Sequence, residues 1–218
     1  MSFFVTGTDT NAGKTYVASL LIRSLRKRGI DCVGMKPICS GGREDAEELR
    51  QAGDDAAELN HVNPVWLRAP AAPYTAAMIE NRMIDLDLVR ESFAVLRAKH
   101  ASVVVEGVGG WLVPILRDYF VADLAAEMAL PVVVVVPNRL GALNHTMLTV
   151  RAIQSAGLRC AGVILNQLSP ENDADTAMVT NRGVLETLLG EPLLLEVPHG
   201  TREIELGADT LQKLGESV

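Results

Sequence analysis

A phosphate-binding loop lies seven residues from the start of the chain. Gly7-Thr8-Asp9-Thr10-Asn11-Ala12-Gly13-Lys14-Thr15 is a glycine-containing turn that ends in Gly-Lys-Thr. A strand-like run over 3–5 precedes it, and apolar residues recur at helical spacing over 17–25. In such a turn the backbone N–H groups face an anion, Lys14 reaches the outer phosphates, and the Thr15 hydroxyl can ligate Mg²⁺. The loop therefore predicts a site for ATP or GTP.

The spacing of this loop departs from the common pattern. Five residues separate Gly7 from Gly13 where four are usual, and Thr8 stands at the usual position of the first glycine. This spacing indicates a subgroup of phosphate-loop proteins.

A second lysine, Lys36, directly follows an apolar strand-like run and is followed by Pro37, Ser40 and Gly41. A solvated lysine at a strand end is the plain alternative. We favour a functional role, because a second ammonium beside Lys14 is poorly stabilised unless anions occupy the space between them. Ser40, in a glycine-containing turn, could donate to the same anion. Two cations predict a pair of anionic ligands.

Three carboxylates are candidates for binding Mg²⁺. Glu106 ends a hydrophobic run, where the acidic residue of a Walker B motif lies and can hold Mg²⁺ directly or through water. A strand-end charge paired with a lysine is its alternative. Asp54 and Asp55 lie in a polar stretch before a predicted helix, where residue type alone favours helix capping.

Two further segments could approach a ligand. Gly107, Gly109 and Gly110 permit a close approach of the backbone, although glycines alone indicate little. Asn144 precedes an apolar-periodic segment and is expected to cap a helix whose N-terminus can bind an anion. Plain capping explains Asn144 equally well.

The rest of the chain alternates between strands and helices. Apolar strand-like runs cover 32–36, 103–105 (ending at Glu106), 132–136, 160–165 and 193–197, with helical periodicity over 86–96, 143–150 and 184–188. This alternation predicts an α/β fold with a doubly wound, mostly parallel sheet in a single domain over 1–218. Because ligands bind beyond the carboxyl ends of such strands, Lys36, Glu106, Asn138 and Asn166 are expected at one edge.

Composition excludes several classes of function. A net charge of −7 and a pI near 5.1 argue against general binding to nucleic acid or an anionic membrane. The sequence has no basic-then-apolar leader and no apolar run near the ~20 residues that span a bilayer, so a cytoplasmic location is expected. Cys32, Cys39 and Cys160 fit neither a disulfide framework nor a paired metal motif.

The ordered set of motifs resembles the dethiobiotin synthetase family. The motifs are the loop over 7–15, Lys36-Pro37 with Ser40-Gly41, Glu106-Gly107-Val108-Gly109-Gly110-Trp111, and Leu140-Gly141 with Asn144-His145. The resemblance spans most of the chain and implies a phosphate-loop NTPase fold. It also implies an ATP- and Mg²⁺-dependent cyclo-ligase of biotin synthesis that closes a cyclic urea from CO₂ and 7,8-diaminononanoate.

In that reaction one amine captures CO₂ as a carbamate, and the carbamate oxygen attacks the γ-phosphate. The second amine then displaces phosphate from the carbamic–phosphoric anhydride. The resemblance implies that Lys14 stabilises the γ-phosphoryl group and that Lys36 stabilises the carbamate. The two ammonium groups would offset the repulsion between these two anions. Ser40 joins these lysines as a catalytic candidate.

The resemblance also assigns the remaining site residues. The metal residues are Thr15, Glu106 and Asp55, with Asp54 as the alternative to Asp55, and those near the diamine or carbamate are Thr10, Lys36 and Ser40. Gly141 and Asn144 would receive the substrate carboxylate from the neighbouring subunit of a homodimer. The residues expected to bind the nucleotide are Asp9, Thr10, Asn11, Ala12, Gly13, Lys14, Thr15, Tyr16, Glu106, Gly109 and, at the adenine, Asn166 and Pro198.

The chain departs from the family at three places: Asn11-Ala12 replace a frequent Glu-Val, the segment 70–74 lacks the Ser-Pro-His found in many members, and the region 173–179 has no tyrosine for the substrate carboxylate. The main alternative is a partitioning or scaffold ATPase that acts as a nucleotide-dependent dimer switch. Such proteins usually carry a lysine early in the loop, where this chain has Thr8, Asp9 and Thr10. An amidating ligase of the cobyrinate-synthase kind would normally need a glutamine-hydrolysing domain, for which the chain has no room.

Overall fold

A six-stranded parallel sheet forms the centre of the computed structural model, which describes residues 1–170, 176–190 and 193–215. The strand order is β10-β9-β8-β1-β5-β2, and every pairing is parallel. This confirms the predicted doubly wound α/β fold. The strands of this sheet are β1 (Phe3–Gly7), β2 (Cys32–Met35), β5 (Ser102–Gly110), β8 (Val132–Pro137), β9 (Cys160–Asn166) and β10 (Leu193–Val197).

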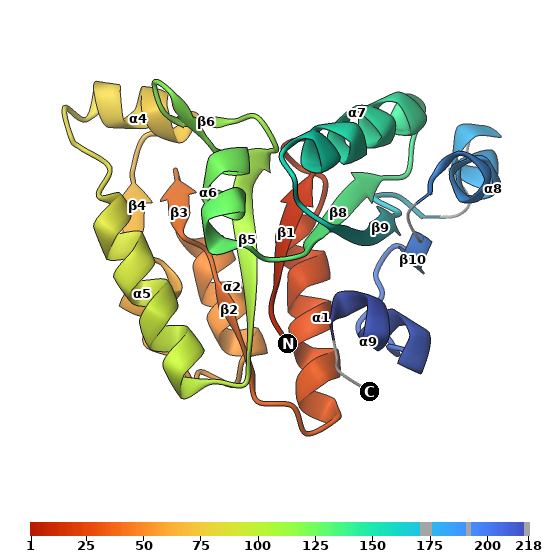
Figure 1. Cartoon of the computed structure of the whole chain (residues 1–218), viewed down its shortest axis with the longest axis horizontal. Helices are drawn as coiled ribbons and strands as arrows, with labels where there is room; N and C mark the ends of the chain where they lie inside the picture. The colour runs from red at the N-terminus through yellow and green to blue at the C-terminus, as the bar shows by residue number, and fades with distance from the viewer. Residues whose placement is uncertain (171–175, 191–192, 216–218) are drawn as a thin grey trace.

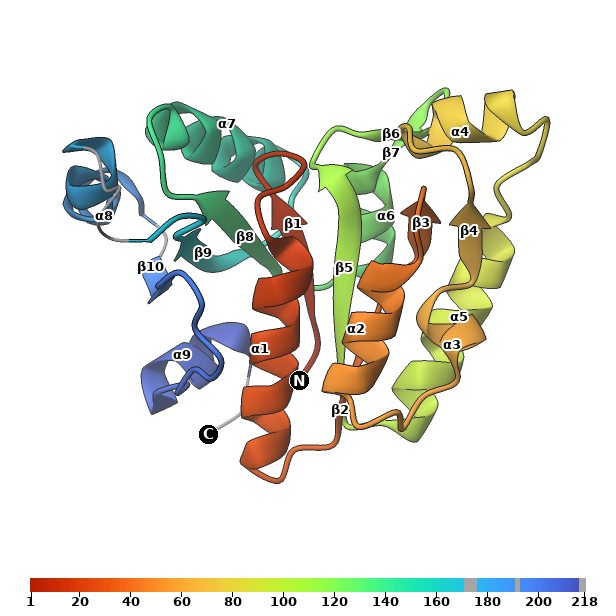
Figure 2. The same ribbon diagram turned by 180° about the vertical axis from the view of Figure 1, so that it is seen from behind.

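Helices cover both faces of the sheet. Helices α1 (Lys14–Lys27) and α2 (Glu44–Ala52) lie on one face, and α5 (Leu86–Lys99), α6 (Val121–Met128) and α7 (Ala142–Ser155) lie on the other (Figures 1 and 2). This two-sided cover explains the continuous apolar run of β8, whose six residues are all buried. Helix α1 is amphipathic and buries Val17, Leu21 and Leu25 against the sheet.

The remaining elements lie around the central sheet. Two of them are two-stranded sheets, one parallel and one antiparallel. Sequence periodicity does not identify strands of two or three residues, because so short a run contains no repeat. These elements are β3 (Ile38–Ser40) with β4 (Val65–Leu67), β6 (Pro114–Leu116) with β7 (Tyr119–Phe120), and the helices α3 (Leu59–Val62), α4 (Pro73–Ile79), α8 (Thr176–Leu188) and α9 (Ala208–Leu214).

Strand β5 differs from the sequence prediction in its length. It continues through Glu106 to Gly110, so Glu106 lies within the sheet, opposite Val5 of β1, instead of at the strand's end. The glycines after Glu106 let the strand run beside the phosphate loop, and Gly110 pairs with Gly7.

None of the described helices combines the length and apolarity needed to cross a membrane.

Candidate active site

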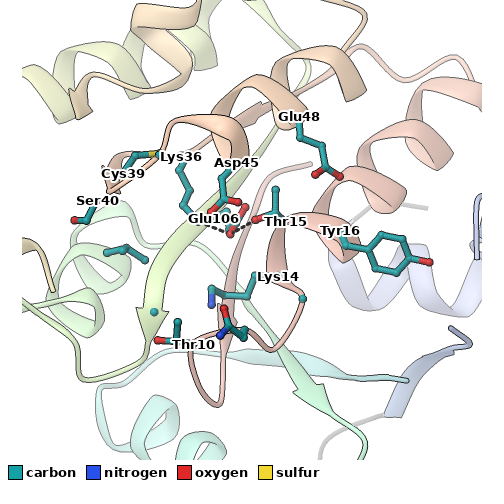
Figure 3. Close-up of a pocket in the computed structure, with 15 residues that line it drawn as sticks. Thr10, Lys14, Thr15, Tyr16, Lys36, Cys39, Ser40, Asp45, Glu48 and Glu106 are labelled. Carbon is teal, nitrogen blue, oxygen red and sulfur yellow. Dashed lines mark hydrogen bonds and ion pairs between the residues drawn. The ribbon is translucent and has the colours of Figure 1, made fainter. Parts of the chain in front are cut away.

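A cavity of about 460 Å³ opens at the carboxyl edge of the sheet, between the phosphate loop, β3, α2 and β5 (Figure 3). Polar and charged side chains from three segments far apart in the sequence point into it. The lining residues are Thr10, Asn11, Gly13, Lys14, Thr15, Tyr16, Lys36, Cys39, Ser40, Gly42, Asp45, Glu48, Glu106, Val108 and Gly109.

The phosphate loop holds its conformation through glycine and through a contact with β9. Gly13 has φ +82°, and a Cβ there would lie 2.1 Å from the Asn166 Nδ2. Asn166 in turn donates to the carbonyl oxygen of Ala12 at 3.0 Å. The loop therefore needs glycine at position 13 both for its backbone angle and for the space that Asn166 occupies.

Lys14 folds back over the loop, and its Nζ lies 3.3 Å from the carbonyl oxygen of Asp9. Burial, together with the charge of Lys36, lowers the pKa of Lys14 to about 8. The ammonium thus lacks the anionic partners that would hold its pKa at the ordinary value. An anion in the cavity, such as a phosphate, would supply them.

Lys36 is in the opposite situation. Its Nζ contacts Glu106 Oε1 and lies 3.0 Å from Asp45 Oδ2 (Figure 3). Lys36 and Glu106 are almost completely buried, with exposed fractions of 3% and 0%. Burial alone would lower the pKa of Lys36, but the two carboxylates raise it above its ordinary value, so Lys36 stays charged.

The same contacts act on the two acids. Burial raises the pKa of Glu106, and Lys36 offsets this in part. Burial would also raise the pKa of Asp45, but the charge of Lys36, 3.0 Å away, holds it below its ordinary value. The pairing of Glu106 with a lysine, one of the two sequence interpretations, is therefore present, and it coexists with a position beside the phosphate loop.

The donor set at Thr15 suits Mg²⁺. The Thr15 Oγ1 lies 2.9 Å from Glu106 Oε1, and Glu106 Oε2 is buried with no hydrogen-bond partner among the described residues. Asp45 lies beside them. Among the residues that the structure describes, no group of three or more His, Cys, Asp or Glu side chains could hold a metal by itself. A hydroxyl and one or two carboxylates fit Mg²⁺, which takes its remaining ligands from phosphates and water.

The structure corrects the expectation for Asp55 and its alternative Asp54. Both residues follow the C-terminal end of α2, outside the cavity, with Asp55 paired to Arg50 at 2.8 Å and Asp54 to Arg26 at 2.6 Å. Asp45, in the first turn of α2, is the carboxylate that enters the cavity. The helix that follows β3 begins at the carboxyl edge of the sheet, so its first turn lies near the site and its last turn far away.

Ser40 and Cys39 form the far wall at the end of β3. The Ser40 Oγ is buried and has no hydrogen-bond partner among the residues described, so it is available to a ligand. Burial raises the pKa of Cys39 to about 12, which keeps it a thiol and excludes a thiolate nucleophile. Gly109, at φ +62°, belongs to the opposite wall beside Thr10.

The two residues expected at the adenine lie beside the cavity instead of in its lining. Asn166 is 1% exposed, and its Oδ1 accepts no hydrogen bond from the described chain. Pro198 directly follows β10, whose last residue, Val197, is paired with Asn166. An unpaired acceptor next to the phosphate loop indicates where a ligand's N–H donor would lie.

The residues expected to bind the substrate carboxylate lie outside this cavity. Gly141 is the N-cap of α7, and Asn144 is an exposed residue of its first turn that makes no capping bond, so the expected cap is wrong. Asp9 is also exposed, 3.6 Å from Arg139. The region 173–179 falls partly outside the described residues, and the segment 70–74 leads into α4 without lining the cavity.

Comparison with known proteins decides the family. An AAA domain family model matches residues 1–202. A protein from Akkermansia muciniphila named ATP-dependent dethiobiotin synthetase BioD is 47% identical over 91% of this chain and 92% of its own length. One of the same name from Aromatoleum aromaticum is 42% identical over 91% and 90%. The chain belongs to the dethiobiotin synthetase family.

Comparison with solved structures supports only the fold of this synthetase. The septum site-determining protein MinD from Pyrococcus horikoshii, complexed with Mg-ADP, matches with a TM-score of 0.55 at 16% identity over 98% of this chain and 87% of that one. A ParA family ATPase from Chlorobium tepidum matches with a TM-score of 0.54 at 14% identity over 91% and 83%. Both carry the phosphate-loop fold, and the sequence relatives favour the synthetase over the partitioning ATPase.

Sequence reasoning missed Asp45 and Glu48 as lining residues of the cavity. A usable signal was present: Gly41-Gly42 closes the turn after Ser40, and the acidic run that follows starts a helix at Glu44. The first carboxylate to face back toward such a turn lies within the first helical turn.

Proposed function

We propose that this synthetase joins CO₂ to 7,8-diaminononanoate and closes the urea ring at the expense of ATP. One amine bonds to the carbon of CO₂ and loses a proton, which gives the carbamate. A carbamate oxygen then bonds to the γ-phosphorus as ADP leaves. Finally the second amine bonds to the carbamate carbon, loses a proton and expels inorganic phosphate. The product has gained one carbonyl group and lost two hydrogens.

The observation that carries this proposal is the contrast between the two lysines of the cavity. Lys14 is buried with a lowered pKa and, within the described part of the chain, donates only to a backbone carbonyl, whereas Lys36 is held charged by Glu106 and Asp45. Lys14 is therefore suited to the transferring phosphoryl group, which provides its missing counter-charge. Lys36 is suited to a carbamate, because a fixed cation orients one anion against another without having to reorganise.

Ser40 is suited to hold the carbamate from the other side. Its hydroxyl, at the end of β3 in the wall of the cavity, is a buried donor without a partner among the described residues. A donor at this position would fix the carbamate plane, which determines which oxygen faces the γ-phosphate. Thr10, on the phosphate-loop side of the cavity, is the corresponding residue near the diamine.

Thr15, Glu106 and Asp45 would hold Mg²⁺ in this protein, with Asp45 in place of the Asp55 expected from the sequence. When bound, Mg²⁺ would offset the negative charge of the nucleotide's phosphates. The residues themselves bring the carboxylates to the phosphate loop and keep Lys36 charged.

We further propose that the whole chain, residues 1–218, acts as one domain in a cytoplasmic homodimer. Gly141 and Asn144 are exposed and lie outside the lining of their own chain's cavity, which suits residues that serve a neighbouring subunit. Exposed apolar side chains flank them, with Leu112, Leu140 and Leu148 exposed by 65%, 82% and 61%. Association through this surface would place α7 of one subunit over the cavity of the other.

The reaction is tested by omitting its components one at a time. Purified protein with ATP, Mg²⁺, bicarbonate and the diamine should release phosphate, and no mixture that lacks one of these should. Mass spectrometry should detect the added carbonyl in the diamine product. Phosphate release without the diamine would contradict the proposal, and partner-stimulated hydrolysis without a small-molecule product would favour the partitioning ATPase.

The assignment of Lys36 is tested by Lys36→Ala, with the exposed Lys27→Ala as the matched control. We expect a loss of turnover of more than about 100-fold in Lys36→Ala with ADP binding retained, because fixed electrostatic contacts to reacting groups contribute this much. Retained ADP binding also shows that the variant is folded. Loss of ADP binding with normal turnover at saturating ATP would reverse the roles of the two lysines.

The subunit arrangement is tested by mixing two inactive variants, Lys14→Ala and Asn144→Ala. In a mixed dimer one site carries both substitutions and the other carries neither. Random re-assortment of equal amounts should therefore restore about a quarter of the wild-type activity. Recovery of no activity, with mixed dimers present by native mass spectrometry, would place Asn144 in its own chain's site or outside both.

A further inference from the structure

One hydrogen bond connects the phosphate-loop helix to the segment after the last strand. Tyr16 is the third residue of α1 and lines the cavity, and its hydroxyl donates to the backbone carbonyl of Thr201, 185 residues later. The Tyr16 ring points away from the Lys14 and Thr15 side chains, toward that segment (Figure 3).

The turn over 198–201 is closed by its own hydrogen bonds. The backbone N–H and the hydroxyl of Thr201 both donate to the carbonyl oxygen of Pro198, at 3.2 and 2.8 Å, and Gly200 has φ +73°. The turn starts directly after Val197, which pairs with Asn166 and accepts from the backbone N–H of Gln167 at 2.9 Å. One end of the turn is therefore fixed by the sheet and the other by Tyr16.

This turn and Asn166 form two sides of one rim beside the phosphate loop. Asn166 contacts the loop through Ala12, and both Asn166 Oδ1 and Gln167 Oε1 are buried acceptors without a partner in the described chain. The family resemblance assigns Asn166 and Pro198 of this rim to the adenine, so the base of a nucleotide whose phosphates occupy the loop is expected along it. The free acceptors suit an amino group on that base.

The other contacts that hold the following segment to α1 lie farther from the cavity. Lys27 pairs with Glu203 at 2.7 Å, but both side chains are more than 70% exposed, and Arg28 donates to the carbonyl oxygen of Leu206 at 2.8 Å. An exposed ion pair contributes little to position. Among these contacts, only the Tyr16 bond joins a lining residue of the cavity to the turn.

We propose that Tyr16 is a positioning residue for the base of the nucleotide, whose hydroxyl fixes the 198–201 turn so that the turn and Asn166 form a preformed seat. The proposal rests on the proposed function only in that ATP binds at this loop. Tyr16 does not touch the reacting atoms. It sets nucleotide affinity and the preference for a base that carries an amino group, and it leaves the chemical step unchanged.

The test is Tyr16→Phe, which removes only the hydroxyl. Binding of ADP, of IDP, whose hypoxanthine base has no amino group, and of inorganic tripolyphosphate is measured by calorimetry without the diamine. We expect the Kd of ADP to rise about five- to tenfold, in line with the loss of one hydrogen bond. The Kd of tripolyphosphate, which has no base, should stay unchanged, and the ratio of the IDP Kd to the ADP Kd should fall. In turnover, the KM for ATP should rise while kcat and the KM for the diamine stay constant.

Two controls separate positioning from general stability. Tyr119→Phe removes another hydrogen-bonded hydroxyl, 2.7 Å from Glu127, on a residue that does not line the cavity, and Lys27→Gln removes the exposed ion pair of the same segment. Both should bind ADP as the wild type does. An unchanged Kd for ADP in Tyr16→Phe, or an equal rise for ADP and tripolyphosphate, would overturn the proposal. Because these measurements need no diamine, a failure of diamine-dependent phosphate release would instead overturn the proposed reaction alone.

Discussion

Replacement of Lys14 by methionine should make the nucleotide-free protein more stable. Lys14 is 6% exposed and its pKa lies at about 8, because burial and the nearby charge of Lys36 disfavour the ammonium. Methionine has a similar length and no charge, so it removes this penalty. Lys14, which we expect to bind phosphate, would then be a residue that lowers the stability of the nucleotide-free protein.

The magnitude follows from the two pKa values of Lys14. The interval from the ordinary 10.5 to about 8, at ~1.4 kcal/mol for each pH unit, corresponds to about 3 kcal/mol. The folded-state pKa is lowered, so the cost is complete at pH below about 8 and disappears between pH 8 and 10.5. The variant loses the 3.3 Å contact with Asp9, so we expect a net gain of about 2 kcal/mol at pH 7, or ~4–8 °C in Tm.

Lys36→Met, in the same cavity, should change the stability in the opposite direction and destabilise the protein. Removal of Lys36 leaves Glu106, which is 0% exposed, as a buried carboxylate without its cation. Breaking a buried pair in this way costs about 3–5 kcal/mol. The pKa of Lys36 is raised in the folded state, so its stabilising contribution is complete below pH 10.5 and disappears only as the pH rises through the higher folded-state value.

Thermal unfolding of the wild type and both variants, without nucleotide and at several pH values from 6 to 10, measures both effects. Lys14→Met should unfold above the wild type at pH 7 and approach it toward pH 10. Lys36→Met should unfold below the wild type throughout. A destabilised Lys14→Met at pH 7, or shifts of the same sign in both variants, would refute the reasoning from burial and pairing.

Three further predictions concern ligands. Because phosphate binding restores the proton of Lys14, ATP affinity should fall above about pH 8, and calorimetry in buffers of different ionisation enthalpy should record proton uptake. Asp45→Asn should raise the Mg²⁺ concentration for half-maximal turnover about tenfold or more, as loss of one carboxylate ligand predicts, whereas Asp55→Asn should leave it unchanged; equal effects would contradict the corrected assignment. Gly13→Ala should abolish ADP binding, because its Cβ would lie 2.1 Å from Asn166 Nδ2, and calorimetry that detects normal binding would contradict this account of the loop.

The sequence predicted well those features that depend on local pattern. The strand-loop-helix around Lys14 has its own signature, and the apolar run of β8 is typical of a strand covered on both faces. The rule that parallel strands end at one edge then brought Lys36 and Glu106 toward the loop, and the structure places both in the cavity. Each of these inferences needs only a few neighbouring residues and the fold class.

The choice of acid in the polar stretch could not be made in the same way. Asp45, Asp54 and Asp55 are equivalent by residue type, and only the position of α2 distinguishes them. A helix of nine residues is about 14 Å long at ~1.5 Å per residue, so its two ends cannot serve the same site. The predicted end of β5 at Glu106 was wrong for a related reason, because pairing of Gly110 with Gly7 continues the strand beyond its apolar run.

Strand order explains why one carboxylate can serve both lysines. Strand β5 lies between β1, which leads into the loop with Lys14, and β2, which ends before Lys36. Glu106 on β5 therefore stands between two cations and contacts both Lys36 and Thr15. With β2 next to β1, the two ammonium groups would have met without a carboxylate between them, and Lys36 would have shared the lowered pKa of Lys14. The order of strands, which single-sequence patterns do not specify, thus gives the two lysines their different charge environments and their different roles.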